Sequence, residues 1–210
     1  TVRGDRINYP GDTGAPTADL PIIKLLWNSV LSSPGAKYFT MDISNFYLNT
    51  PLPRPEYMRM PIKLMPEEIV QKYNLKDIEE QGMVYMKIVK GMYGLPQAGK
   101  LANEQLIKRM RKAGYNPCQF TPGLWRHVWR PVTFTLVVDD FGIKFKGNEH
   151  ANHLKKTLGR WYNITIDWTG SKYVGISLKW DYKTRTLQIS VPGFVDKALA
   201  KYQHPKPAKP

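Results

Sequence analysis

The amino-acid sequence predicts an α+β fold, in which an antiparallel sheet packs on helices. Helical and β-rich stretches are mixed along the chain, without the strict strand–helix–strand alternation that predicts a parallel sheet. Neighbouring β-rich runs separated by short turns predict hairpins and therefore antiparallel pairing. Apolar residues make up 42% of the 210 residues and charged residues 23%, so the chain can bury a sizeable core.

The first predicted helix follows a lead-in, residues 1–18, that is rich in Gly, Pro, Asp and Thr. Asp19 can cap this helix, Pro21 suits its first turn, and apolar residues then repeat at helical spacing. The Ser-Ser-Pro-Gly sequence at residues 32–35 ends the helix. The next stretch, residues 37–42, is predicted to be a short strand that ends in an acid.

Prolines limit what the middle of the chain can form. Three prolines in residues 50–55 remove hydrogen-bond donors, so this stretch cannot be a central strand. Apolar spacing and turn signals then predict four further elements. They are a helix over 66–73, a strand over 83–89, a turn over 91–96 and a helix over 97–112.

A hairpin with an acidic tip is the clearest feature of the second half. Asp139 and Asp140 separate the β-rich runs 133–138 and 141–145, and we place this acidic pair at the turn. The elements expected after it are a helix over 149–161 with Trp161 facing inward, a hairpin from 173–181 and 186–191, and a helix over 194–202.

The charge of the chain favours a polyanionic partner. Lys and Arg number 31 and Asp and Glu 17, which gives a net charge of +14 and a sequence pI of about 9.8. No stretch approaches the ~20 apolar residues that span a bilayer, so no membrane partner is expected. Cys118 is the single cysteine, which excludes an internal disulfide and fits a reducing compartment. The chain starts at Thr1 without Met or a signal peptide, and we expect it to be a piece of a longer protein.

Three aspartates carry the strongest chemical signal. A single acid such as Asp42 at a strand end is common. The pair Asp139-Asp140 is unusual, because adjacent carboxylates repel each other and hairpin turns favour Asn-Gly or Asp-Gly. A cation would relieve the repulsion. Carboxylates are the hard oxygen ligands that Mg²⁺ prefers, and two or three of them can hold a two-metal site for phosphoryl transfer.

Five segments occur in an order that resembles a reverse transcriptase, most closely the copia type of LTR retrotransposon rather than the gypsy type. They are FTMDISNFYLNTPL, EYMRMP, KGMYGLPQAG, LVVDDFGIKF and KYVGISLKWD, and the resemblance runs from about Asp5 to Tyr202. It implies the palm of a right-hand polymerase, with partial fingers and most of the thumb missing. The implied division is 1–37 for partial fingers, lead-in and helix, 38–192 for a palm with a fingers insertion at about 50–95, and 193–210 for the start of a thumb or a connecting tail.

The resemblance implies an RNA-directed DNA polymerase, a nucleotidyltransferase that adds dNTPs to a primer 3′ end by two-metal phosphoryl transfer. Its cofactors would be two Mg²⁺ ions, for which Mn²⁺ can substitute. Its partners would be an RNA template, a DNA primer or an RNA–DNA hybrid, and dNTPs. The parent would be a Pol polyprotein with ribonuclease H and integrase domains that serves transposition. It would act inside the cell, in a cytoplasmic particle or in the nucleus.

The resemblance also assigns the catalytic residues. Asp42 resembles the first metal-binding aspartate of the palm and Asp139 the second. Asp140 resembles the neighbour that supports the metal site with less direct ligation. Ile43 lies where the backbone would approach the metal and the incoming triphosphate.

Further positions match residues that hold the substrates. Tyr47 matches the aromatic residue that blocks a ribose 2′-hydroxyl, the group that distinguishes RNA from DNA precursors. Gln97 matches a glutamine that contacts the incoming nucleotide, and Arg3 and Arg6 are candidates for the basic pair on the triphosphate. The residues that resemble the primer grip are Tyr173, Val174, Gly175 and Ile176.

Several of these features also have purely structural interpretations. Tyr47 can pack in a core, and Gln97 suits the N-terminus of a helix. The basic residues within 108–112 and 155–160 can form solvated helix faces or contact phosphates. Tryptophans can stack on bases, although most large aromatic residues pack in cores. His127 is expected at the surface.

Two alternative functions remain open from the sequence. The first is an inactive remnant of a retrotransposon polymerase that binds nucleic acid without turnover. The second is a P-loop nucleotide hydrolase, because residues 94–100 fit G-x-x-x-x-G-K between a strand-like run and a helix. Leu101 stands where that loop carries Ser or Thr, and Pro96 lacks the N–H that a phosphate-binding loop donates, so the second reading is the weaker.

Overall fold

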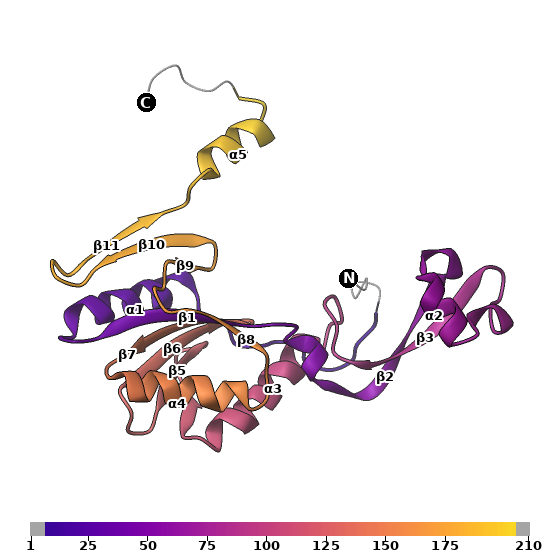
Figure 1. The fold of residues 1–210 in the computed structure, drawn as a ribbon, viewed down its shortest axis with the longest axis horizontal. Helices are drawn as coiled ribbons and strands as arrows, with labels where there is room; N and C mark the ends of the chain where they lie inside the picture. Colours follow the sequence, from indigo (N-terminus) through magenta and orange to yellow (C-terminus); the bar gives the residue numbers. More distant parts are fainter. Residues whose placement is uncertain (1–6, 205–210) are drawn as a thin grey trace. The chain divides into compact units, whose positions relative to one another are not determined.

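The computed structural model describes residues 7–204, whose contacts divide into two units. The first unit contains the described residues up to Ala15 together with Asn45–Leu106. The second contains Pro16–Ser44 and the described residues from Ile107 onward. Mixed helices and antiparallel sheets confirm the α+β class (Figure 1). The two units are defined only by contacts within the chain and do not test the predicted division into fingers, palm and thumb. That division stays a prediction.

A six-stranded antiparallel sheet forms the centre of the second unit, in the order β4-β5-β6-β7-β1-β8. Its strands are β1 (Lys37–Ile43), β4 (Tyr115–Pro117), β5 (Leu124–His127), β6 (Val132–Val137), β7 (Asp140–Phe145) and β8 (Ile164–Asp167). The predicted β1, β6 and β7 are confirmed within one residue. The strands β4, β5 and β8 were not predicted, because runs of three or four residues show too little alternation.

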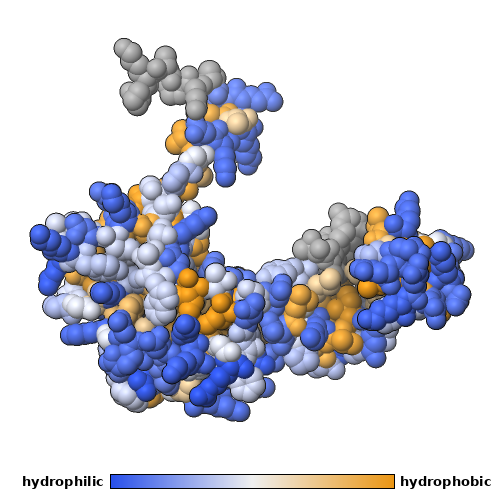
Figure 2. Space-filling view, in the orientation of Figure 1, coloured by the Kyte–Doolittle hydropathy of each residue, from blue (hydrophilic) through white to orange (hydrophobic). Residues whose placement is uncertain are grey.

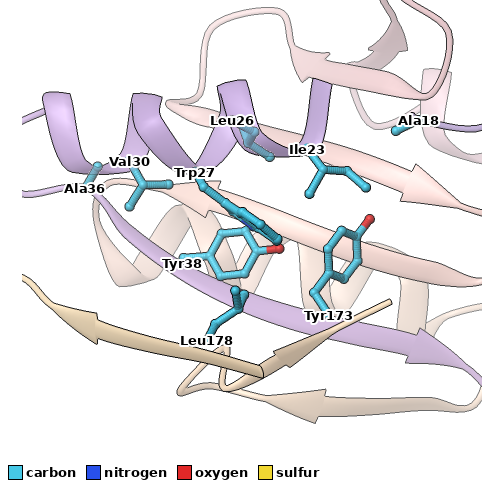
Figure 3. Close-up of a cluster of buried hydrophobic side chains, with 9 residues drawn as sticks. All are labelled: Ala18, Ile23, Leu26, Trp27, Val30, Ala36, Tyr38, Tyr173 and Leu178. Atoms are coloured by element: carbon cyan, nitrogen blue, oxygen red, sulfur yellow. The ribbon is translucent and has the colours of Figure 1, made fainter. Parts of the chain in front are cut away.

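Helix α1 (Leu20–Ser32) covers one side of this sheet together with a three-stranded sheet, as Figure 3 shows. The predicted cap is confirmed, since the Asp19 side chain accepts a hydrogen bond from the Ile22 N–H at 3.0 Å. The smaller sheet has the order β11-β10-β9. Its strands are β9 (Lys172–Tyr173), β10 (Ile176–Asp181) and β11 (Thr186–Ser190). The shared cluster comprises Ala18, Ile23, Leu26, Trp27, Val30, Ala36, Tyr38, Tyr173 and Leu178.

One continuous strand over 173–181 was expected, and that prediction is wrong. Val174 and Gly175 both have positive φ, at 43° and 81°, and form a turn between β9 and β10. Positive φ at two consecutive residues is the geometry of a type I′ hairpin turn, which Gly accepts without strain. The predicted hairpin therefore consists of three short strands.

Helix α4 (Asn148–Gly159) covers the opposite side of the six-stranded sheet (Figure 1). Its buried residues are Ala151, Leu154, Thr157 and Leu158. Trp161 was expected to face inward, but its side chain is 49% exposed because the helix ends before it. His127 was expected at the surface and is instead buried, where its Nε2 lies 3.0 Å from the carbonyl oxygen of Ala113.

Two further helices follow the sequence predictions closely. Helix α3 (Ala98–Arg111) begins in the first unit and ends in the second. Its buried apolar residues, Ala98, Ala102, Leu106 and Met110, lie on the predicted side, where Leu101 is half-buried, and Asn103 is buried as well. Helix α5 (Phe194–Lys201) is also confirmed.

The first unit is built on a two-stranded antiparallel sheet of β2 (Pro51–Pro61) and β3 (Met83–Lys90). Its proline-rich strand is an edge strand, which confirms that it is not a central one. Helix α2 (Glu67–Lys72) lies between these strands in sequence. Three short 3₁₀ turns are η2 (Tyr47–Asn49), η3 (Ile62–Leu64) and η4 (Leu75–Asp77).

Candidate active site

The antiparallel pairing of β1 with β7 brings the predicted acids together. Asp42 and Asp140 are direct partners in the register. Partner Cα atoms in an antiparallel pair lie about 4.5–5.5 Å apart, so residues distant in sequence meet here. The N–H of Ile43 donates to the carbonyl oxygen of Asp139 at 3.2 Å, which ties the end of β1 to the β6–β7 turn.

The β6–β7 turn is strained at its first residue. Val137 pairs with Asp140, so Val138 and Asp139 form a two-residue turn. The φ angle of Val138 is +59°, a region that β-branched residues rarely adopt. Positive φ at the first central position is typical of a type II′ turn, where Gly is usual. Backbone strain of about 1–2 kcal/mol is therefore held beside the acids.

The three carboxylates share one unfavourable electrostatic environment. Partial burial, followed by the charges of Asp139 and Asp42, raises the pKa of Asp140 to about 6. Burial and the charge of Asp139 also raise the pKa of Asp42. Among residues 7–204, no group of three or more His, Cys, Asp and Glu side chains is arranged to hold a metal ion. The acids thus form a locus of concentrated negative charge that a cation would stabilise.

An open hollow lies in front of Asp42 and Asp140. Its lining comprises Thr40, Met41, Asp42, Asp140, Thr165, Asp167, Lys172, Tyr173, Val174 and Gly175. Sequence reasoning placed the acids and the 173–175 segment at a site but missed Asp167 and Lys172, because β8 was not predicted.

Asp167 is held ionised at the rim of this hollow. Burial works to raise its pKa, but hydrogen bonds from Thr169 and Ser171 outweigh burial and lower the pKa to about 2. Both residues donate through backbone N–H and hydroxyl groups. The sequence signal was available as an Asp followed two and four residues later by Thr and Ser, the pattern of a side-chain-capped turn.

Tyr173 anchors the predicted primer-grip segment instead of projecting from it. Its side chain is 2% exposed, and its hydroxyl donates to the Thr135 carbonyl oxygen at 3.0 Å. The Thr135 hydroxyl donates in turn to the Tyr173 hydroxyl at 3.1 Å. Val174 and Ile176 are half-buried and Gly175 is exposed, and the turn at 174–175 lines the hollow together with Tyr173.

Gly142 creates the space in which two tyrosines lie on the sheet. A Cβ at this position would stand 2.8 Å from Tyr173 Cζ and in hard contact with the Tyr38 hydroxyl. No larger residue fits without moving one of these buried rings. The sequence Asp139-Asp140-Phe141-Gly142 therefore combines two acids, a buried aromatic residue and a close-approach glycine.

The other predicted substrate residues lie in the first unit. Gln97 is 3% exposed and its Nε2 donates to Glu56 Oε1 at 2.8 Å. Tyr47 is half-buried, with its ring centroid 4.5 Å from that of Tyr93. Both side chains thus take part in packing within that unit, and their nucleotide-binding roles stay predictions. Arg3 and Arg6 lie outside the described residues.

The segment 94–100 lacks the surroundings of a phosphate-binding loop. It follows β3, a strand of an antiparallel two-stranded sheet, and no parallel strand–helix–strand unit surrounds it among the described residues. Lys100 Nζ lies 2.9 Å from Asp12 Oδ2, so the lysine already has a carboxylate partner. The P-loop hydrolase hypothesis is therefore wrong.

Comparison with known proteins agrees with this geometry. A family model described as reverse transcriptase (RNA-dependent DNA polymerase) matches residues 3–206. The matched range contains all the acids and the predicted substrate residues. A search of curated proteins found no match. Within the described range, no helix combines the length and apolar character needed to cross a membrane.

Proposed function

Because the chain belongs to the reverse transcriptase family, we propose that it carries the catalytic centre of an RNA-directed DNA polymerase that extends a primer 3′ end with dNTPs. One observation carries the proposal. The β1–β7 register places Asp42 opposite Asp140, beside the strained turn that contains Asp139. Asp42 and Asp140, whose pKa values are both raised, line an open hollow, and such acids are suited to a cation-dependent reaction on a phosphate substrate.

The donor set fits Mg²⁺, with Mn²⁺ as its substitute. Asp42 and Asp139 would hold the metal, supported by Asp140 and by the backbone carbonyl of Ile43. Mg²⁺ is usually bound by one or two carboxylates together with water and substrate phosphates, so a preformed cluster of three ligands is not required. The bound metal would polarise the phosphoryl oxygens and neutralise the charge that develops on them.

The protein's own residues would orient the reactants. The turn at 174–175 would hold the primer end at the rim of the hollow, with Tyr173 and Ile176 anchoring the segment. Tyr47 would exclude the 2′-hydroxyl, and Gln97, Arg3 and Arg6 would contact the incoming nucleotide. Catalysis would then come from positioning and electrostatics, without a covalent protein intermediate.

The proposal extends to the context of the chain. We place it in a copia-like Pol polyprotein that carries ribonuclease H and integrase domains and acts in transposition. Its partners would be an RNA template, a DNA primer or an RNA–DNA hybrid, and dNTPs. The parent particle would be intracellular, either cytoplasmic or nuclear.

The test is addition of a single nucleotide to a DNA primer on an RNA template, with Mg²⁺ or Mn²⁺. We expect Asp139→Asn to abolish addition, because it removes a charged ligand. Asp181→Asn is the matched control. The Asp181 carboxylate accepts hydrogen bonds from the backbone N–H groups of Lys183 and Thr184, which an amide oxygen can also accept. Normal addition by Asp139→Asn would refute the proposal.

The net charge of +14 favours one second candidate, a domain that binds nucleic acid without turnover. Steeply salt-dependent binding of an RNA–DNA hybrid, with no addition in either metal, would identify that function.

A further inference from the structure

A cationic and aromatic surface lies on the side of the six-stranded sheet opposite the acids. Successive side chains of a strand point to opposite faces, so Phe39 points away from the hollow that Asp42 lines. The Phe39 ring stacks on Trp168 with centroids 4.7 Å apart, and Lys155 Nζ of α4 lies 6.0 Å from the Trp168 centroid. The end of α4 and Trp168 therefore share the face that the candidate active site does not use.

A groove at this end of α4 contains cations and no acid. Its lining comprises Lys155, Lys156, Gly159, Arg160, Tyr162, Asn163 and Ile164. Within the described part of the chain, none of the three cations forms an ion pair with a carboxylate. Figure 2 shows a hydrophilic surface over α4. Three cations close together without carboxylate partners repel one another, and a bound polyanion would remove that repulsion.

Two half-exposed tryptophans accompany the cations. Trp161 is 49% exposed and Trp168 is 46% exposed. The Arg109 guanidinium lies 4.8 Å from the Trp161 ring centroid and 4.9 Å from that of Tyr162, so the Trp161 side chain is fixed from within the protein. Indole faces held in place beside cations are the elements of a surface on which unstacked bases lie.

We propose that this surface binds a single-stranded segment of RNA. Lys155, Lys156 and Arg160 contact its phosphates, and Trp161 and Trp168 stack on its bases. A single strand fits better than a duplex because the bases of a duplex present no free faces to an indole ring. An acidic protein segment would satisfy the cations but would leave the exposed parts of the two tryptophans uncovered. The proposal does not depend on polymerase activity.

The first measurement is fluorescence anisotropy of a labelled single-stranded RNA of about 12 nucleotides across a series of KCl concentrations, with no divalent metal. The combined variant Lys155→Ala, Lys156→Ala, Arg160→Ala should bind about tenfold more weakly at low salt. Its slope of log K against log[KCl] should be shallower by about 2, because three phosphate contacts at about 0.7 each are lost.

A matched control separates this surface from net charge. The variant Lys63→Ala, Lys72→Ala, Lys76→Ala removes the same number of exposed cations from the first unit. It should change the slope and the affinity by much less. Equal changes in the two variants would overturn the proposal, since the effect would then reflect overall charge.

Two further measurements test the location and the ligand. On addition of the RNA, amide hydrogen exchange should slow in residues 155–168, and Trp161→Ala should weaken binding about fivefold while Trp161→Phe restores most of it. Protection confined to 40–43 and 138–142 would overturn the proposal. So would displacement of the RNA by a poly-glutamate peptide of equal charge at equal concentration, because the surface would then be a general anion site.

The polymerase proposal is tested by a different experiment from the RNA-binding proposal. The RNA measurements use no primer, nucleotide or metal, whereas nucleotide addition reports only on the acids. An unlabelled blunt-ended RNA–DNA hybrid, which has no single-stranded overhang, should leave the labelled RNA bound to the protein at saturating concentration. Complete displacement by the hybrid would place both ligands in one site and overturn the second surface.

Discussion

The two faces of the six-stranded sheet use the same strands for opposite purposes. On the face covered by α1, strand β1 presents Asp42 at its end, beside Tyr173 and the hollow. On the face covered by α4, the same strand presents Phe39 and Met41, which are 0% and 2% exposed. Fully burying each apolar side chain stabilises the fold by about 1.5–3 kcal/mol, whereas neighbouring acids destabilise it. The apolar face thus stabilises a strand that also carries mutually repelling charges.

The comparison also explains why negative and positive charge do not cancel in this unit. Side chains alternate along a strand, so a sheet separates neighbours in sequence onto different faces. Asp42 and Asp140 share one face, whereas Lys155 and Arg160 lie with α4 on the other. A metal and a polyanion could then be bound by one small unit without competing for the same side chains.

The largest expected effect comes from comparing residues on opposite faces of the paired strands β1 and β7. Asp42→Asn should lower nucleotide addition by at least about 10²–10³-fold, because it removes a charge preorganised for phosphoryl transfer. Ile143→Val, at the β7 position that pairs with Phe39 on the opposite face, should leave addition within about twofold. Single-turnover kinetics measure both. Similar losses in the two variants would show that the faces are not functionally separate.

A second pair of variants compares how tightly side chains pack around a glycine on each face of the six-stranded sheet. Gly142→Ala should lower the free energy of unfolding by about 1–3 kcal/mol, since the new methyl group collides with Tyr38 and Tyr173. Gly159→Ala, in α4, meets only Ile164 Cδ1 at 4.0 Å and should raise stability by up to about 1 kcal/mol. Urea denaturation measures the free energy of unfolding of both variants. A stable Gly142→Ala protein would contradict the close packing proposed beside the acids.

Removing charge from the acid face should stabilise the fold. The pKa of Asp140 is raised to about 6 in the folded state, so the folded protein binds this proton more tightly than the unfolded chain does. Its ionisation therefore lowers stability as pH rises from about 4 to 6. At pH 7, Asp140→Asn should add about 1 kcal/mol after allowance for solvent screening of this half-exposed group. Thermal melting of the two proteins at pH 4 and pH 7 measures this gain in stability. An equal gain at both pH values would show that it does not come from removing the charge of Asp140.

The smallest effect is expected at Asp167 and has the opposite sign. Hydrogen bonds from Thr169 and Ser171 overcome burial and lower the pKa of Asp167 to about 2, so its ionised form stabilises the folded state above pH 4. This contribution is lost as pH falls from about 4 to 2. Asp167→Ala should therefore lower the melting temperature slightly at pH 7 and not at pH 2. A higher melting temperature at pH 7 would contradict the account.

Local sequence signals predicted the elements whose ends are marked by capping residues, turn residues or prolines. The cap at Asp19 and the edge position of 50–55 appear as predicted. The hairpin turn lies one residue earlier than predicted, at Val138 and Asp139, and Asp140 is already the first residue of β7. Each depends on backbone conformation over a few residues, which side-chain chemistry sets directly. The break at Val174 was missed in outlining the strands, because a positive φ at a β-branched residue contradicts its local preference.

The sequence by itself determined the α+β class, the family resemblance and the identity of the three acids, because residue type and short-range spacing are sufficient for each. Only the tertiary structure decided that Asp140, and not Asp139, lies directly opposite Asp42. It also decided that Tyr173 is buried and that Asp167 lines the same hollow. These facts depend on strand register and on packing between segments far apart in the chain. Neither leaves a local pattern, because a pairing energy is shared by two distant stretches and cannot be read from either one alone.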